Sequence, residues 1–232
     1  MRKFACLLLA LALLAPCAAR GELMDAALET APPIPLLCES AVLVEPESGQ
    51  ILFEQNADER RPVASVTKIM AILLALEALE AGRATLEDPV PVSQTAAGMG
   101  GSQVLLDAGE TLPFETLLKS MIVGSANDAT VAIGEYLYGS HQLFVDRMNE
   151  RAQELGMADT HFVNSTGLPA EGHYTTARDV ARMTVEMLKH PLYFEYSTIW
   201  LDSVIHESGR ETQLTNTNRL IRFYPGATGL KT

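Results

Sequence analysis

The segment RPVASVTKIMAILLALEALEAG, residues 61–82, decides how this chain folds. After Lys68 it is apolar at nearly every position, so it predicts a helix that is buried on almost all sides. Gly82 is expected to end this helix. Lys68 itself stands three residues after Ser65, and residues at this spacing share one face of a helix. The sequence therefore places a lysine beside a serine and away from water.

This pair has the chemistry that an activated serine needs. A serine hydroxyl is a weak nucleophile until a base removes its proton, and an ordinary lysine with a pKa of about 10.4 is already protonated at neutral pH. Burial and a second nearby cation both lower the pKa of a lysine. The amino end of a helix would also stabilise a developing oxyanion. Taken alone, Ser65 and Lys68 fit a helix-capping serine and a lysine that reaches the surface equally well.

Length and composition indicate one large domain in an acidic protein. The chain has 232 residues, of which 47% are hydrophobic, and its formal net charge is -12. Such a core is large enough for a single domain, with or without a small second lobe. The negative charge argues against nucleic acid or an anionic membrane as the main partner.

The first 19 residues are predicted to be a signal peptide. A basic start is followed by a short apolar run and then by small residues around Cys17. A membrane anchor and a lipoprotein acylated at Cys17 are the alternatives, and the second fits poorly because Pro16 precedes the cysteine. We expect residues 20–37 to form an extended leader and the mature chain to act outside the cytoplasm. Cys38 is expected to be a small buried hydrophobic residue, without an intrachain disulfide partner in the mature chain.

The order of patterns along the chain predicts an α+β fold. A hairpin is expected first, with Val42 and Val44 on one face of its first strand and the opposite face covered as well. Helices are expected next, with a break at residues 124–127 and an N-cap at Thr176. The pattern becomes β-like again after Trp200. We therefore expect one antiparallel sheet, built from both ends of the chain and flanked by helices.

Two further short motifs accompany the serine and the lysine. Ser125 and Asn127 lie in the expected break between two helices, where they would also be ordinary capping residues. Lys231 and Thr232 end the sequence in GATGLKT and have no significance alone. Together, Ser-x-x-Lys, Ser-x-Asn and Lys-Thr, in this order, are typical of serine acyltransferases that recognise penicillin.

The flanking sequence resembles the D-alanyl-D-alanine carboxypeptidases, which are low-molecular-weight penicillin-binding proteins. The resemblance covers roughly residues 38–232, which we take as a serine D,D-peptidase domain. It is carried by the blocks ASVTKIM, GGSQVLL, VGSANDATVAI, FVDRMNERAQELGM, THFVNSTGL, YTTARDVARM and TNTNRLI…GATGLKT. It implies the β-lactamase and penicillin-binding transpeptidase-like fold, with an antiparallel sheet, flanking helices and an all-helical lobe.

The resemblance also implies a role for each motif residue. Ser65 would be the nucleophile that forms an acyl-enzyme, and Lys68 its general base. Ser125 would relay a proton to the leaving amine, and Asn127 would hydrogen-bond the substrate amide. Lys231 would keep Lys68 neutral and bind the substrate carboxylate. Thr232 would hydrogen-bond that same carboxylate.

The family pattern continues beyond the motif that closes this sequence. A glycine would follow Thr232, then a second oxyanion donor and further strands. We therefore expect the domain to be incomplete at its C-terminus, with an open sheet edge and with membrane association only through a missing C-terminal segment. Poor folding or inactivity of this polypeptide is a corresponding hypothesis.

The expected activity is removal of the terminal D-alanine from peptidoglycan stem peptides that end in D-Ala-D-Ala, with β-lactam antibiotics acylating Ser65. The alternatives are a D,D-endopeptidase, a class A-like β-lactamase that uses Glu171, and a non-catalytic protein that binds penicillin or the cell wall. The chemistry requires no cofactor. The five histidines lack the spacing of a metal motif, so no metal site is expected. The turn at Asn164, Thr166 and Gly167 is interpreted as structural.

Overall fold

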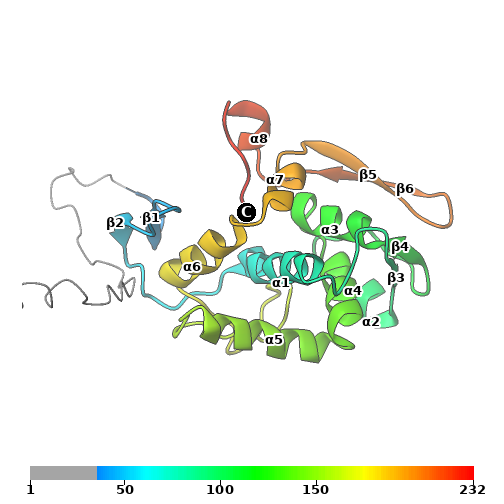
Figure 1. Cartoon of the computed structure of the whole chain (residues 1–232), viewed down its shortest axis with the longest axis horizontal. Helices are drawn as coiled ribbons and strands as arrows, with labels where there is room; N and C mark the ends of the chain where they lie inside the picture. Colours follow the sequence, from blue (N-terminus) through cyan, green and yellow to red (C-terminus); the bar gives the residue numbers. More distant parts are fainter. Residues whose placement is uncertain (1–35) are drawn as a thin grey trace, which may run out of the picture.

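The computed structural model describes residues 36–232 of the chain. A hairpin comes first, a long helical region follows, and a second hairpin and a short helix end the chain (Figure 1), in agreement with the predicted α+β class. The elements are β1 (Ala41–Val44), β2 (Ile51–Gln55), a 3₁₀ turn η1 (Ala64–Thr67), α1 (Lys68–Glu80), β3 (Pro89–Pro91), α2 (Gln94–Ala97), β4 (Thr111–Pro113), α3 (Phe114–Val123), α4 (Asn127–Tyr138), α5 (His141–Glu154), α6 (Ala177–Met187), α7 (Pro191–Ser197), β5 (Leu201–Ile205), β6 (Glu211–Thr215) and α8 (Leu220–Phe223).

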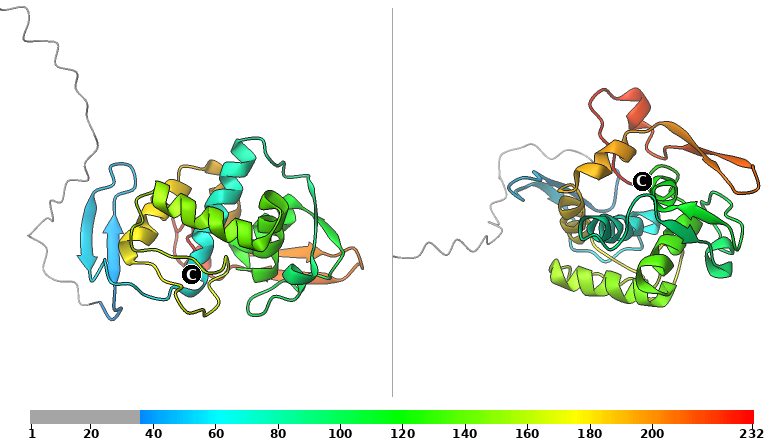
Figure 2. Two further views of the ribbon diagram at one scale, coloured as in Figure 1. Left: turned by 90° about the horizontal axis from the view of Figure 1, so that it is seen from below. Right: turned by 45° about the vertical axis from the view of Figure 1, so that its right-hand side comes forward.

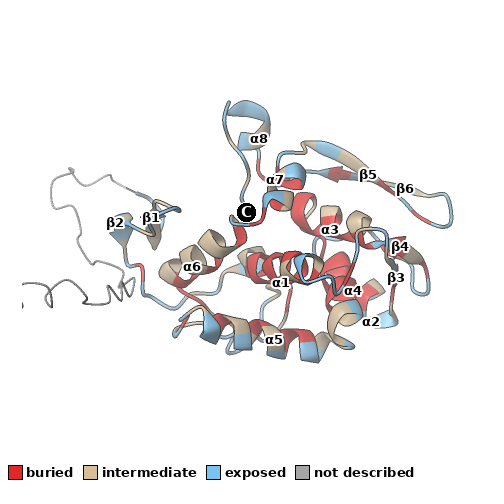
Figure 3. Cartoon of the chain, in the orientation of Figure 1, coloured by how far each residue is buried: buried red, intermediate tan, exposed pale blue. Residues whose placement is uncertain are grey.

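Helix α1 forms the centre of the molecule, as its apolar sequence predicts. Every residue from Lys68 to Leu76 is buried (Figure 3), and the helix contacts α3, α4, α5 and α6. A fully buried leucine or isoleucine contributes about 1.5–3 kcal/mol, so this helix supplies much of the core's free energy. Gly82 follows the helix with a φ of 65°, and its N–H donates to the Leu79 carbonyl. The predicted end of the helix is thus confirmed.

The helices around α1 also agree with the sequence pattern. The predicted break at residues 124–127 is confirmed, because α3 ends at Val123 and α4 begins at Asn127. Thr176 caps α6, where its side-chain oxygen accepts a hydrogen bond from the backbone N–H of Asp179. The carboxylate of Asp179 accepts hydrogen bonds from the Asp159 backbone N–H and from the Thr160 hydroxyl, and these bonds join α6 to the preceding loop.

The predicted first hairpin is present, but only one of its faces is covered. Strands β1 and β2 pair antiparallel, and Val42 and Val44 are half-buried on the face that packs against α6. On the opposite face Leu43 is 54% exposed and Leu52 is 42% exposed. The prediction that both faces are covered is therefore wrong for the described residues, because no element of this structure packs on that side.

The described strands form three separate antiparallel pairs, β1–β2, β3–β4 and β5–β6. The expectation of one sheet built from both ends of the chain is therefore wrong. The β1–β2 pair packs on α6, whereas β6 contacts α3. In Figures 1 and 2 the two hairpins lie at opposite ends of the helical layer, with α6, α1 and α3 between them.

The N-terminal predictions fall mostly outside the described residues. The signal peptide at residues 1–19 lies outside them, and so does most of the leader at residues 20–37. Cys38 is exposed, so its predicted burial is wrong. It precedes β1 at the edge of the hairpin, where its carbonyl accepts from Gln55 at 2.7 Å. Within residues 36–232, no helix combines the length and the apolar character needed to cross a membrane.

Candidate active site

Ser65 and Lys68 lie at the junction of η1 and α1, where the chain enters the core. Ser65 is in the 3₁₀ turn and Lys68 is the first residue of α1. The tight turn brings the Ser65 Oγ within 3.0 Å of the Lys68 Nζ, and the two groups are hydrogen-bonded. The predicted pairing of their side chains is therefore present in the structure.

Lys68 is enclosed by protein on every side. The side chain has no exposed surface, and its Nζ donates a second hydrogen bond to the Thr166 carbonyl at 2.7 Å. Burial, and to a smaller extent the charge of Lys231, lower the pKa of Lys68 to about 7. A neutral amine in this position donates one proton to the carbonyl and can turn its lone pair to the serine hydroxyl. The geometry therefore allows the Lys68 amine to accept the proton of the Ser65 hydroxyl.

The loop Asn164–Gly167 supplies that carbonyl and is fixed by its own first residue. The Asn164 Oδ1 accepts hydrogen bonds from the backbone N–H groups of Thr166 and Gly167. Gly167 has a φ of 82°, and a Cβ at this position would lie 1.7 Å from the Ala64 carbonyl oxygen. Only glycine allows the loop backbone to approach the serine turn so closely. The loop is thus a structural turn, as predicted, but it also contacts Lys68, which the sequence did not indicate.

Ser125 and Asn127 lie in the turn between α3 and α4. Ser125 is buried and adopts a left-handed conformation with a φ of 58°, which is unfavourable for a residue other than glycine. The Asn127 Nδ2 donates to the Gly100 carbonyl at 2.6 Å, while its backbone N–H donates to the Ser102 carbonyl at 2.7 Å. Within the described part of the chain, the Ser125 Oγ and the Asn127 Oδ1 are buried without hydrogen-bond partners. Such atoms are costly unless a ligand satisfies them.

The rim loop Gly100–Leu106 is attached to the amino end of α4. The buried carboxylate of Asp128 accepts hydrogen bonds from the backbone N–H groups of Val104 and Leu106. Burial raises the pKa of Asp128, and these backbone donors oppose that rise. A Cβ on Gly101 would lie 2.8 Å from the Asn127 Nδ2 and 3.4 Å from a methyl group of Leu168. The rim loop, the Ser125 turn and the loop that holds Lys68 therefore meet at one place.

Lys231 and Thr232 approach the site in an extended segment. Lys231 is 9% exposed, and burial lowers its pKa to about 8. Its Nζ donates to the Thr232 backbone oxygen at 2.6 Å, and its charge acts on Lys68. The segment is held by hydrogen bonds from Ser197 to the Thr228 carbonyl and from Asn218 to the Leu230 carbonyl. Thr232 itself is exposed. The structure thus couples Lys231 electrostatically to the serine and lysine pair.

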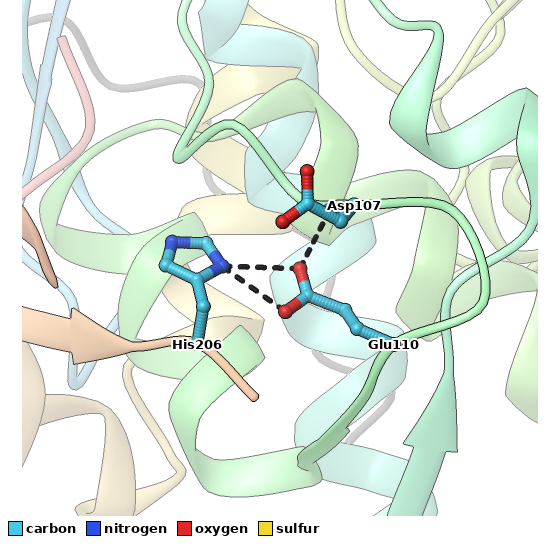
Figure 4. Close-up of side chains that lie close together, drawn as sticks. All are labelled: Asp107, Glu110 and His206. Carbon is cyan, nitrogen blue, oxygen red and sulfur yellow. Dashed lines mark hydrogen bonds and ion pairs between the residues drawn. The ribbon is translucent and has the colours of Figure 1, made fainter. Parts of the chain in front are cut away.

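A second cluster of titratable side chains lies where the loop before β4 meets the end of β5. Figure 4 shows Asp107, Glu110 and His206, whose side-chain ligand atoms lie within 4.8 Å of one another. The His206 Nδ1 is 3.1 Å from both oxygens of Glu110, and its Nε2 is 3.0 Å from the Thr212 hydroxyl. The Arg210 guanidinium lies 3.1 Å from Asp107 and 3.2 Å from the His206 ring, so a cation already balances these carboxylates. The cluster joins the β5–β6 hairpin to the loop before β4.

Comparisons with known proteins identify the family. The family model described as D-alanyl-D-alanine carboxypeptidase matches residues 27–232. The chain belongs to this family. The Bacillus subtilis D-alanyl-D-alanine carboxypeptidase DacF is 44% identical over 194 residues, which are 84% of this chain and 50% of that protein. The Escherichia coli D-alanyl-D-alanine endopeptidase is 29% identical over 216 residues, 92% of this chain and 68% of that protein.

A solved structure shows the same fold. The crystal structure of the Francisella tularensis D-alanyl-D-alanine carboxypeptidase DacD superposes with a TM-score of 0.80 at 30% identity, covering 86% of this chain and 60% of that one. The predicted penicillin-binding transpeptidase-like fold is thereby confirmed. The match to this chain covers only 50% of the length of the Bacillus relative.

Proposed function

We propose that this chain is a serine-type D-Ala-D-Ala carboxypeptidase that acts on peptidoglycan stem peptides and is acylated by β-lactams. The observation that carries the proposal is the Lys68 amine, which is buried, has a pKa of about 7 and is hydrogen-bonded to the Ser65 hydroxyl. A lysine in this state serves as a general base near neutral pH. Membership in the carboxypeptidase family supports the same reaction.

The first half of the reaction forms an acyl-enzyme. Lys68 takes the Ser65 proton as Oγ attacks the carbonyl carbon of the penultimate D-alanine. The new bond joins Oγ to that carbon, and the tetrahedral oxyanion lies near the backbone N–H of Ser65 at the start of the helical segment. The bond to the nitrogen of the terminal D-alanine then breaks. The proton held by Lys68 passes through the Ser125 hydroxyl to this leaving amine.

The second half hydrolyses the ester. A water molecule loses a proton to Lys68 and attacks the acyl carbon, and the Ser65 oxygen leaves and regains the proton. Penicillin follows only the first half efficiently, because its strained amide opens and its leaving group stays attached. The acylated Ser65 then reports directly on the nucleophile.

Substrate recognition falls to the remaining predicted residues. We assign the substrate carboxylate to Lys231 and Thr232, since a buried ammonium at 9% exposure is a strong partner for a carboxylate. Asn127 would accept a hydrogen bond from a substrate N–H through its Oδ1, which is buried and has no partner among the described residues. Substrate binding would thus satisfy a group that the protein leaves unpaired.

The test combines labelling with product release. The chain is incubated with a fluorescent penicillin and, separately, with a peptide ending in D-Ala-D-Ala. We expect a saturable mass increase on Ser65, release of D-alanine, and neither in a Ser65→Ala variant. Peptide binding without D-alanine release, together with no acylation, would instead identify a non-catalytic wall-binding protein.

A D,D-endopeptidase is the second candidate, because a relative with that name aligns over 92% of this chain. Cleavage of a cross-linked dimer of stem peptides in preference to a free D-Ala-D-Ala end would favour it. We place either reaction outside the cytoplasm, where peptidoglycan lies. Accessibility of the chain to an external protease in intact cells tests this location.

A further inference from the structure

A buried histidine joins the two segments that enclose Lys68. The His173 ring is 7% exposed and lies between the helix side and the loop side of the candidate active site. Its Nε2 is 2.8 Å from the Thr67 hydroxyl, and its Nδ1 accepts a hydrogen bond from the Val163 backbone N–H at 3.1 Å. Thr67 directly precedes Lys68 in the chain, and Val163 directly precedes the loop Asn164–Gly167.

These contacts define the protonation state of the ring. A backbone N–H can only donate, so the Nδ1 of His173 must carry a lone pair. The proton of the neutral ring then lies on Nε2, which donates to the Thr67 hydroxyl oxygen. Adding a second proton at Nδ1 would set two donors against each other at 3.1 Å and break the hydrogen bond to Val163. The arrangement is therefore compatible only with neutral His173.

The Val163 bond affects the base through a short path. The loop that follows Val163 carries the Thr166 carbonyl, which holds the Lys68 Nζ at 2.7 Å. The other end of the ring bonds Thr67, whose neighbour is Lys68 itself. One side chain thus sets the spacing between the helix that presents the amine and the carbonyl that orients it.

We propose that neutral His173 is a positioning residue for Lys68, and that its protonation releases the Asn164–Gly167 loop and weakens acylation. The effect on activity rests on the proposed function. The two hydrogen bonds that join His173 to Thr67 and Val163, called the latch below, do not depend on it. His173 makes no contact with Ser65 in this scheme and takes no part in proton transfer.

The surrounding groups favour the neutral ring. Burial lowers the pKa of His173, and the charge of His161 lowers it further. His161 pairs through its backbone with Tyr174, the residue after His173. The helix side presents Lys68, one residue after Thr67. Arg60 stacks on the Tyr174 ring, beside His173 in sequence. Phe162 contributes an uncharged aromatic face with its ring centroid 5.9 Å from that of His173.

A second histidine near the loop has a different main contact. The His141 Nε2 is 2.9 Å from the Ser165 hydroxyl, which can either donate or accept, and it also accepts a longer hydrogen bond from the Ser165 backbone N–H at 3.5 Å. Protonation of His141 therefore preserves the shorter contact by reversing its direction and loses only the longer one. Val163 offers no such reversal, so His173 is the residue whose protonation breaks the latch.

The structural test measures the latch without using activity. The chain is labelled with nitrogen-15, the His173 tautomer is read from long-range nitrogen–proton correlations, and amide exchange is followed at Val163 between pH 8 and pH 5. We expect the Nε2–H tautomer at pH 8 and a fall of about tenfold in the Val163 protection factor as His173 gains a proton. An Nδ1–H tautomer, or full protection of Val163 beside a protonated His173, overturns the proposal.

Matched variants separate the latch from general damage. His173→Gln keeps one acceptor and one donor but does not titrate, so Val163 should remain protected down to pH 5. His161→Gln removes the exposed neighbour, whose Nδ1 contacts the Gly172 carbonyl. It should keep the pH-dependent loss of Val163 protection, with the transition moved to higher pH because the charge of His161 no longer lowers the pKa of His173. A pH-dependent loss of Val163 protection that persists in His173→Gln contradicts the assignment, even if an apolar variant such as His173→Leu fails to fold.

The activity test uses the second-order rate of acylation by a fluorescent penicillin. If only Lys68 is protonated, the logarithm of the rate should fall with a slope of one on the acid side of the pH–rate profile. Protonation of His173 as well should make this slope steeper at lower pH. The unmodified chain and His161→Gln should therefore lose rate more steeply below the titration of His173, and His173→Gln should keep the single-proton slope. Identical slopes overturn the effect on acylation. If no form of the chain is acylated, the proposed function fails, while the amide-exchange result still decides the latch.

Discussion

The two lysines of the candidate site lie in regions that are built differently. Lys68 begins α1, the most buried helix among residues 36–232, and has hydrogen bonds to Ser65 and Thr166. Lys231 lies in an extended segment held by contacts from Ser197 and Asn218. Burial is the main cause of the lowered pKa of each lysine, to about 7 and about 8 respectively. The same side chain thus lies in a helical core in one case and in an extended segment in the other.

This difference indicates a division of labour. A base must be neutral and must keep its direction, which the packed environment of Lys68 provides. A partner for the proposed substrate carboxylate must keep its charge near neutral pH, which suits the higher pKa of Lys231, about 8. The charge on Lys231 also favours the neutral form of Lys68. We therefore expect the same substitution to have different effects at the two positions.

The largest effect is expected from Lys68→Met. The substitution removes the base while keeping an unbranched apolar side chain of similar length. The rate of acylation by a fluorescent penicillin should fall by about 10²–10⁴-fold at pH 8, which is the usual contribution of a general base. Stopped-flow or quenched labelling measures this rate. A fall of less than tenfold would mean that another group deprotonates Ser65.

Lys231→Met should have a smaller effect that depends on pH. In the unmodified chain, the rate should rise with pH through about 7 as Lys68 becomes neutral. It should fall again above about 8 as Lys231 loses its charge. Without the Lys231 cation, the pKa of Lys68 rises, so the rising limb moves to higher pH and the rate at pH 7 falls. An unmoved limb in the pH–rate profile would show that the two amines do not interact.

Gly167→Ala tests how closely the loop must approach the serine turn. The new Cβ would lie 1.7 Å from the Ala64 carbonyl, and the φ of 82° is unfavourable for alanine. We expect a loss of roughly 2 kcal/mol or more in unfolding free energy, measured by urea denaturation. Gly172→Ala is the matched control, since its φ is 79° but its nearest neighbouring atoms lie 3.9 Å away. Equal losses in the two variants would exclude the contact with Ala64 as the cause.

Stability should respond to Lys68→Met in the direction opposite to activity. The pKa of Lys68 falls from 10.5 to about 7 on folding, so the folded state binds fewer protons than the unfolded state between these values. Lys68 therefore lowers stability most below pH 7, and this cost disappears as the pH rises towards 10.5. Methionine should raise the unfolding free energy by on the order of 1 kcal/mol at pH 6 and by less at pH 10. Unchanged stability at both pH values would contradict the desolvation of Lys68.

Local sequence pattern was sufficient for the helical framework and for half of the site. The apolar run after Lys68 predicts a buried helix, and the polar break predicts where Ser125 and Asn127 lie. These features follow from hydrophobic periodicity and turn chemistry within a few residues. The prediction that Lys231 lies near Lys68 came from the family resemblance, because their spacing in the sequence does not indicate that they meet.

The remaining features depend on contacts between distant segments. The Thr166 carbonyl acts on Lys68, but every residue has a carbonyl, so the sequence gives no signal for it. His173 and the pair Glu110 and His206 depend on loops that meet only after folding. The exposed Cys38 and the separate hairpins show the same limit, since burial and strand pairing are decided by which elements pack between them.

The most direct test is a titration of the Lys68 amine. Carbon-13 and nitrogen-15 labelling of lysine allows the Nζ of Lys68 to be followed by NMR from pH 5 to pH 11, with assignment from the Lys68→Met variant. A midpoint near 7, moving upward in Lys231→Met, is the predicted result. A midpoint near 10.5 would show that the amine is an ordinary cation and would contradict its role as the base.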